Sequence, residues 1–187
     1  MAANRKDSFM DWFKAGVIAF VLFLFIRIFF FSSYEVEGES MQPTLQDGNR
    51  LVVNKIGYQI QDIHRFDVIV FHANDRDDYV KRVIGLPGDK ITYKDDWLYV
   101  NGVKYQEPYL QQFKHPFPGL NLTGDFTLNE LTNSENVPNG KLFVMGDNRL
   151  GSMDSRHFGY VSIDKVVGKV DVRYWPLDKF NINFRGN

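Results

Sequence analysis

A long apolar run near the amino end constrains this chain more than any other feature. Residues Ala15 to Phe31 are apolar except for Arg27, and with its flanks the run reaches about twenty residues, which spans ~30 Å of hydrocarbon. The basic residues before it are Arg5, Lys6 and Lys14, and the acidic residues after it are Glu35, Glu37 and Glu39. Because cytoplasmic flanks carry the excess of Lys and Arg, the sequence predicts a transmembrane anchor over residues 15–33. Residues 1–14 would then be cytoplasmic, and residues 34–187 would form an extracytoplasmic domain.

A removable signal peptide is the alternative interpretation of the same run. The apolar region of a signal peptide is shorter, and no Ala-x-Ala motif follows this one, although Ser32-Ser33 is a weak small-residue candidate. We therefore expect a retained anchor and a single-pass protein of the cell membrane.

Composition removes several classes of function. The 187 residues suffice for an anchor and one domain, and the net charge of −1 offers no basic surface for nucleic acid. Cysteine is absent, so disulfides and thiolate metal sites are excluded. No two of the four histidines are spaced as i and i+4; they are His64, His72, His115 and His157. We expect no metal, no cofactor and no nucleic-acid partner.

Beyond the anchor, the pattern predicts a mostly β, antiparallel domain. The run from Tyr34 to Ser40 alternates with a period of two, placing three glutamates on one face of an extended segment. Further β-branched segments predict strands at 51–53, 67–71, 79–84, 141–145 and 166–174. Asn101-Gly102 within 97–105 suits the type I′ turn of a hairpin. Residues 93–140 are expected to form this hairpin and an irregular insertion whose role the sequence does not indicate.

Two residues suggest catalysis. Ser40 follows the extended segment in Gly-Glu-Ser-Met-Gln-Pro, but a serine hydroxyl is unreactive without a base within hydrogen-bond reach. Lys81 is a candidate base, because strand alternation turns it away from Arg82 and groups it with apolar neighbours. Burial there would lower its pKa and leave a neutral amine. Taken separately, each residue could equally be an ordinary turn serine or surface lysine.

Three strings in this order resemble the type I signal peptidases, the bacterial leader peptidases, in their compact Gram-positive form. They are Ser-Met-x-Pro-Thr-Leu from Ser40, Lys-Arg-Val-Ile-Gly-Leu-Pro-Gly-Asp from Lys81, and Gly-Asp-Asn-Arg-x-x-Ser-x-Asp-Ser-Arg from Gly146. The resemblance covers most of residues 34–92 and 141–176. It implies a membrane-bound serine endopeptidase that removes signal peptides from secretory preproteins, cutting after small residues at −1 and −3.

The resemblance also implies roles for individual residues. Ser40 would be the nucleophile and Lys81 the general base, with Ser152 hydrogen-bonded to Lys81. Arg82, Asp147, Arg149, Asp154 and Arg156 would support the site through ion pairs. Shallow apolar substrate pockets would be lined by Val36, Met41, Leu45, Leu51, Tyr79 and Val80. The chain departs from some members at Gly38, where a serine assists the oxyanion hole, so backbone N–H groups must do more here.

Two other functions stay open at this point. One is a dedicated Ser/Lys processing peptidase, for example one that serves pili or conjugation. The other is an inactive anchored β domain that only binds exported segments, against which the intact Ser40 and Lys81 argue. A soluble self-cleaving repressor is disfavoured by the apolar run and by the lack of a DNA-binding helix pair.

Overall fold

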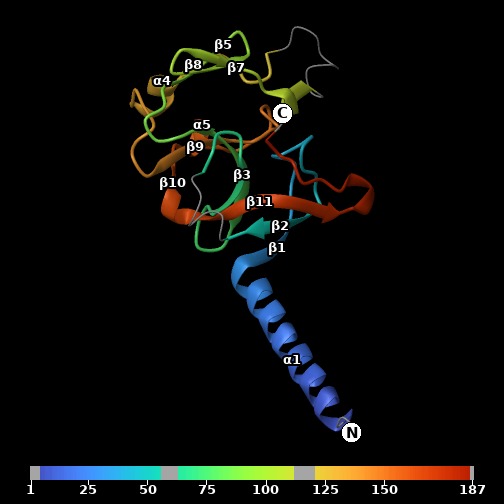
Figure 1. Ribbon diagram of the computed structural model, residues 1–187. Coiled ribbons are helices and arrows are strands. Elements are labelled where there is room, and N and C mark those ends of the chain that lie inside the picture. The colour runs from blue at the N-terminus through green and yellow to red at the C-terminus, as the bar shows by residue number, and fades with distance from the viewer. Residues whose placement is uncertain (1–4, 56–62, 112–120, 186–187) are drawn as a thin grey trace.

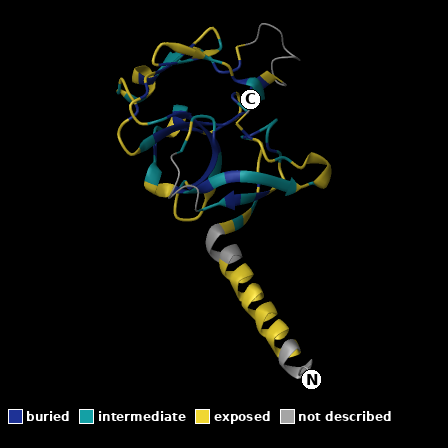
Figure 2. Ribbon diagram, in the orientation of Figure 1, coloured by how far each residue is buried: buried dark blue, intermediate teal, exposed yellow. Residues whose placement is uncertain are grey.

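The long amino-terminal helix stands apart from a β-rich domain. The computed structural model describes residues 5–55, 63–111 and 121–185, with the side chains of 5–8 and 26–30 outside that description. Helix α1 (Arg5–Phe30) extends away from the domain, and its described side chains are exposed (Figures 1 and 2). Within the described residues, no helix combines the length and apolar character needed to cross a membrane. The anchor predicted over residues 15–33 includes 26–30, whose side chains lie outside the described residues.

The domain begins earlier than predicted. Strand β1 (Phe31–Glu35) follows α1 directly and pairs with β2 (Arg50–Asn54), so residues 31–33 belong to the sheet. The extended segment predicted at 34–40 is correspondingly too late. Gly38 has a φ of +86° and donates its amide to Asp47 Oδ1 at 2.7 Å, which turns the chain out of the sheet. The apolar run continues past the end of α1 into β1. Composition alone therefore does not show where the helix ends and the sheet begins.

The larger sheet is antiparallel throughout, as predicted. Its strand order is β1-β2-β11-β3-β4-β9-β10. The members not yet named are β11 (Val166–Trp175), β3 (Val68–His72), β4 (Asp78–Gly85), β9 (Lys141–Met145) and β10 (Val161–Ser162). The strands predicted from β-branched segments are thus confirmed, with their ends shifted by at most one residue.

A smaller antiparallel sheet lies beside the first (Figure 1). Its order is β7-β6-β5-β8, with β7 (Val103–Tyr105), β6 (Trp97–Val100), β5 (Ile91–Lys94) and β8 (Phe126–Thr127). The predicted hairpin turn is confirmed, because Asn101 and Gly102 have φ values of 53° and 80°. The insertion is more regular than predicted: Thr127 and Glu130 form a capping box that begins helix α4 (Leu128–Thr132). Residues 112–120 of the insertion lie outside the described part.

Strand β4 divides the core. Its carboxy-terminal residues are buried on both faces. Val83 packs into a cluster with Phe71 and Val144, whereas Ile84 packs into a cluster shared with the smaller sheet. Because successive side chains alternate, Lys81 points to the Val83 side and Arg82 to the Ile84 side. The packing of β4 in the core therefore determines the opposite directions in which the Lys81 and Arg82 side chains point.

Candidate active site

Ser40 lies on a loop that is held to a second loop by hydrogen bonds to two of its backbone carbonyls. The carbonyl of Ser40 accepts from the Asn148 amide at 3.1 Å, and the carbonyl of Glu39 accepts from Asn148 Nδ2 at 3.2 Å. Within the first loop, the Gln42 amide donates to Glu39 at 3.1 Å. The serine is thus positioned by residues more than one hundred positions away in the sequence.

Lys81 reaches this serine from strand β4. Its Nζ donates to Ser40 Oγ at 2.7 Å and to the Val80 carbonyl at 3.1 Å, and the residue is only 3% exposed. Burial lowers the pKa of Lys81 to about 8, against smaller opposing effects from Asp154 and Asp147. The predicted burial and lowered pKa are therefore present. Near neutral pH a usable fraction of this amine is uncharged and can take a proton from a hydroxyl.

Gly146 allows the two loops to meet. A Cβ added at this position would lie 2.4 Å from the Ser40 carbonyl oxygen and 2.1 Å from Ser152 Oγ, well inside van der Waals contact. The hydrogen bond expected from Ser152 to Lys81 is not formed. Instead Ser152 Oγ is buried without a hydrogen-bond partner among the described residues. The structure places Ser152 at the site but gives its hydroxyl no orienting contact.

Asp154 and Arg156 brace the second loop. The Asp154 carboxylate accepts from the Gly146 amide at 3.0 Å and from Arg156 Nε and Nη2 at 2.9 Å each. Burial alone would raise the pKa of Asp154, but these hydrogen bonds and the Arg156 charge leave it below its ordinary value. Arg156 also donates to the Arg149 carbonyl at 2.7 Å. The hydrogen bonds and the ion pair of Asp154 and Arg156 therefore hold the loop that carries Gly146 in one conformation.

Arg82 and Asp147 form a fully buried pair behind the serine loop. Arg82 Nε and Nη2 donate to the two Asp147 oxygens at 2.8 and 2.7 Å, and both side chains are 0% exposed. Thr44, in the serine loop, donates its hydroxyl to the same carboxylate. The pair expected from the resemblance is thus formed, and it ties β4 to both loops.

Glu107 belongs to the site's support, and no motif or spacing in the sequence indicated it. The buried Arg149 guanidinium pairs with Glu107, and its Nη1 also donates to Tyr93 at 3.0 Å and Thr123 at 2.8 Å. Tyr93 and Glu107 come from the smaller sheet and its exit. Glu107 stands alone before a proline, and only its burial beside an arginine identifies it. The smaller sheet is therefore coupled to the loop that holds Gly146.

A groove of about 600 Å³ passes over Ser40 and Lys81. The expected pocket residues that line it are Val36, Met41, Tyr79 and Val80, together with Gly38. Leu45 and Leu51 are each 0% exposed, lie in the same core cluster as Met41 and do not line the groove. No group of three or more possible metal ligands occurs within the described residues. The site as built can supply a serine, an amine and an open groove.

Comparisons with known proteins find relatives among the signal peptidases. A family model described as "Signal peptidase, peptidase S26" matches residues 9–175. The chain is 58% identical over 181 residues to signal peptidase I of Bacillus caldolyticus, covering 97% of each chain. It is 48% identical over 184 residues to signal peptidase IB of Staphylococcus aureus (strain MRSA252), covering 96% of each. Its structure resembles a crystal structure of a signal peptidase I from Enterococcus faecalis V583, with a TM-score of 0.56 and 45% identity, covering 58% of this chain and 97% of that one.

Proposed function

The chain belongs to the signal peptidase family, peptidase S26, and we propose that it is a membrane-anchored serine endopeptidase that removes signal peptides from exported preproteins. The observation that carries the proposal is the 2.7 Å contact between Lys81 Nζ and Ser40 Oγ. A buried amine with a pKa of about 8 is suited to act as general base for a serine that has no histidine beside it among the described residues.

In the proposed mechanism one lysine moves every proton. Neutral Lys81 takes the proton of Ser40 as Oγ attacks the scissile carbonyl, and the resulting ammonium protonates the leaving amine. That amine is the new amino end of the mature protein, and the signal peptide remains as an ester on Ser40. Lys81, neutral again, then activates the water that hydrolyses the ester.

The negative oxygen formed during attack needs donors. The Gly38 amide is already bonded to Asp47, so it is not free for this purpose. We propose that the Ser40 amide contributes instead, as expected for a chain with glycine at position 38.

The groove is suited to an extended substrate. Strand β4 pairs with β9 only from Arg82 onward, so among the described residues no strand covers that edge at 78–81. A substrate could pair there, opposite the segment 34–39, by adding a strand. Val36 and Met41 line the groove and are only 6% and 1% exposed, so part of its wall is apolar. We propose that this wall forms shallow pockets that accept small residues at −1 and −3.

The membrane anchor is proposed from the sequence. The apolar run, the basic residues before it and the acidic residues after it support a cytoplasmic amino end and an extracytoplasmic domain. Exposed apolar side chains near the carboxy end of β11, namely Trp175, Leu177, Phe180 and Ile182, could add interfacial contact.

The test is cleavage of a preprotein by the purified full-length chain in detergent, with the product's new amino end sequenced. We expect one cut after a small residue, abolished by Ser40→Ala and by Lys81→Ala. Lys81→Arg should fail too, because a guanidinium does not become neutral. Unchanged cleavage in either alanine variant, or a wild-type protein that cuts no preprotein, would overturn the proposal.

A further inference from the structure

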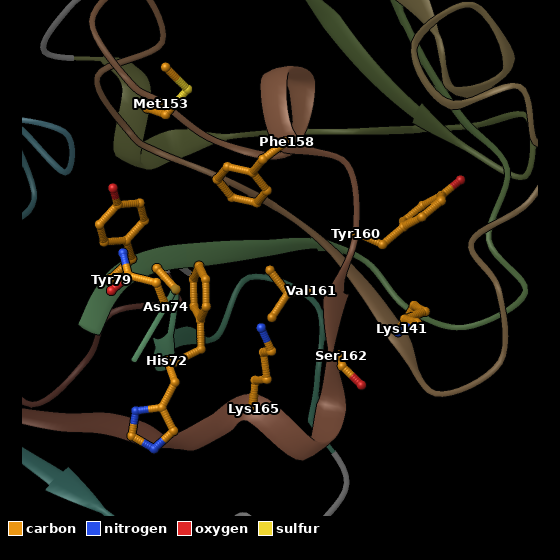
Figure 3. A pocket seen from close by; sticks show the side chains of 12 residues that line it. His72, Asn74, Tyr79, Lys141, Met153, Phe158, Tyr160, Val161, Ser162 and Lys165 are labelled. Carbon is orange, nitrogen blue, oxygen red and sulfur yellow. The ribbon is translucent and has the colours of Figure 1, made fainter. Parts of the chain in front are cut away.

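A second cavity adjoins the catalytic groove. It encloses about 450 Å³ and shares two lining residues, Tyr79 and Met153, with that groove. In Figure 3 these two residues border one side of the cavity, and Tyr160 and Lys141 border the opposite side. A chain lying in the groove therefore has direct access to the cavity.

The floor of this cavity is apolar. Phe71 and Val161 are 2% and 4% exposed and form part of the core. Phe158, whose ring centre lies 6.3 Å from that of Phe71, is 41% exposed, and Met153 is 58% exposed. Apolar side chains left in water beside a hollow gain free energy when a partner covers them.

The cavity carries positive charge without an internal partner. Lys141 and Lys165 both line it, and neither forms an ion pair with a described residue. Lys165 points toward the cavity in Figure 3. None of the residues that line the cavity is acidic, whereas Glu35, Glu37, Glu39, Asp77 and Asp78 line the catalytic groove. The two hollows therefore differ in the sign of their charge.

The position of the cavity indicates which part of a substrate reaches it. Residues 34–41 and 76–81 line the groove together with Gly151 and Met153, so one arm of it lies along Tyr34, in the strand that follows α1. If a signal peptide enters from the membrane, its last residues lie along that arm. Strand β10 and helix α5 (Ser155–Phe158) border the second cavity, and β10 is at the opposite edge of the sheet from β1. The chain after the cut would leave on that side.

We propose that this cavity is a substrate subsite on the leaving side of the dyad, and that it binds an acidic side chain among the first residues of the mature chain. The carboxylate would face Lys141 and Lys165, while the aliphatic part of the side chain would cover Phe158. The inference rests on the proposed function, because it needs a peptide bond cut at Ser40.

The experiment uses the full-length enzyme in detergent and a set of preproteins that differ at one residue. Glu, Gln or Lys is placed in turn at each of the first four positions after the cut and, for comparison, at −2 and −4. We expect wild-type kcat/KM to favour Glu over Lys at one or two leaving-side positions by roughly two- to fivefold, as for exposed charge pairs. High salt should reduce this preference.

Charge reversal assigns the preference to the cavity. Lys141→Glu and Lys165→Glu should each remove or invert it. Lys94→Glu is the matched control, because it makes the same charge change at an exposed position on β5. It should leave the preference intact.

Three outcomes would overturn the subsite while leaving the peptidase intact. One is an equal charge preference in wild type and both cavity variants. The second is a preference confined to positions before the cut, and the third is an effect of the cavity variants only on binding to anionic vesicles. Absence of any cleavage by the wild type would instead contradict the proposed function itself.

Discussion

Gly146 lies so close to the backbone carbonyl of Ser40 that position 146 has no room for a side chain. The oxygen would lie 2.4 Å from a Cβ at position 146, and it belongs to the backbone, so it cannot turn aside as a flexible side chain would. The position of the serine therefore depends on a residue with no functional group.

Gly146→Ala should displace the serine loop. We expect kcat/KM on a preprotein to fall about a hundredfold, because small misplacements of catalytic groups have effects of this order. Gly124→Ala is the control: nothing lies within 4 Å of an added Cβ there, although Gly124, unlike Gly146, has a positive φ of +75°. It should lose some stability and keep its kcat. Equal activity in the two variants would show that the close approach does not position Ser40.

Arg82→Lys should destabilise the fold, although it keeps the charge. Lysine cannot form the two parallel hydrogen bonds to Asp147 and would leave buried acceptors unpaired. Breaking a buried pair typically costs about 3–5 kcal/mol. Arg50→Lys is the control, since its pair with Glu35 is more than half exposed and should contribute less than about 1 kcal/mol. Denaturant unfolding measures both, and similar losses would contradict the role assigned to the buried pair.

Glu107→Gln tests whether the smaller sheet positions the catalytic loop. The amide keeps the size of the side chain but removes the charge that the buried Arg149 guanidinium faces. We expect lower stability and a lower kcat, with KM nearly unchanged, because Glu107 does not line the groove. Glu135→Gln removes a charge from an exposed pair with Lys90 and should change neither quantity. A normal kcat in a folded Glu107→Gln protein would refute the coupling.

The membrane can be tested by shortening the chain at the end of α1. A chain that begins at Phe31 keeps the whole of β1, whereas one that begins at Tyr34 removes more than half of it and should be less stable. The longer form should fold and cut short peptides slowly, and lipid should raise its rate on preproteins by concentrating both partners on one surface. Equal rates on preproteins with and without lipid would argue against a role for the membrane surface.

The sequence predicted most strands because β-branched residues alternate or cluster in short segments bounded by turns. It predicted that Lys81 and Arg82 diverge, because alternation along a strand needs no tertiary information. The turn at Asp95 and Asp96 was missed: both have positive φ, but neither is the glycine or asparagine that usually marks such a turn. Hydrogen bonds from Thr123 to Asp96 and from Asp95 to Asp125 help to hold it, and these partners are about thirty residues away.

The candidate active site, like the fold, could be predicted from the sequence only in part. Ser40 and Lys81 stand in recognisable strings, and strand geometry supplies a reason for the lowered pKa. Leu45 and Leu51 were expected at the groove but lie in the core, because the position of a residue in the sequence does not reveal which way its side chain faces in the fold. The contact of Glu107 with Arg149 depends on how the smaller sheet packs, and nothing local to either residue encodes it.

The pH dependence of kcat/KM on a preprotein tests the central claim most directly. Lys81 acts only when neutral, and burial lowers its pKa from 10.5 to about 8. Activity should therefore fall about tenfold per pH unit below about 8 and level off above it, with no effect of chelators. An acidic limb centred near the roughly 10.4 of a free lysine, or a rate that stays constant from pH 6 to pH 9, would contradict the role of Lys81 as the general base.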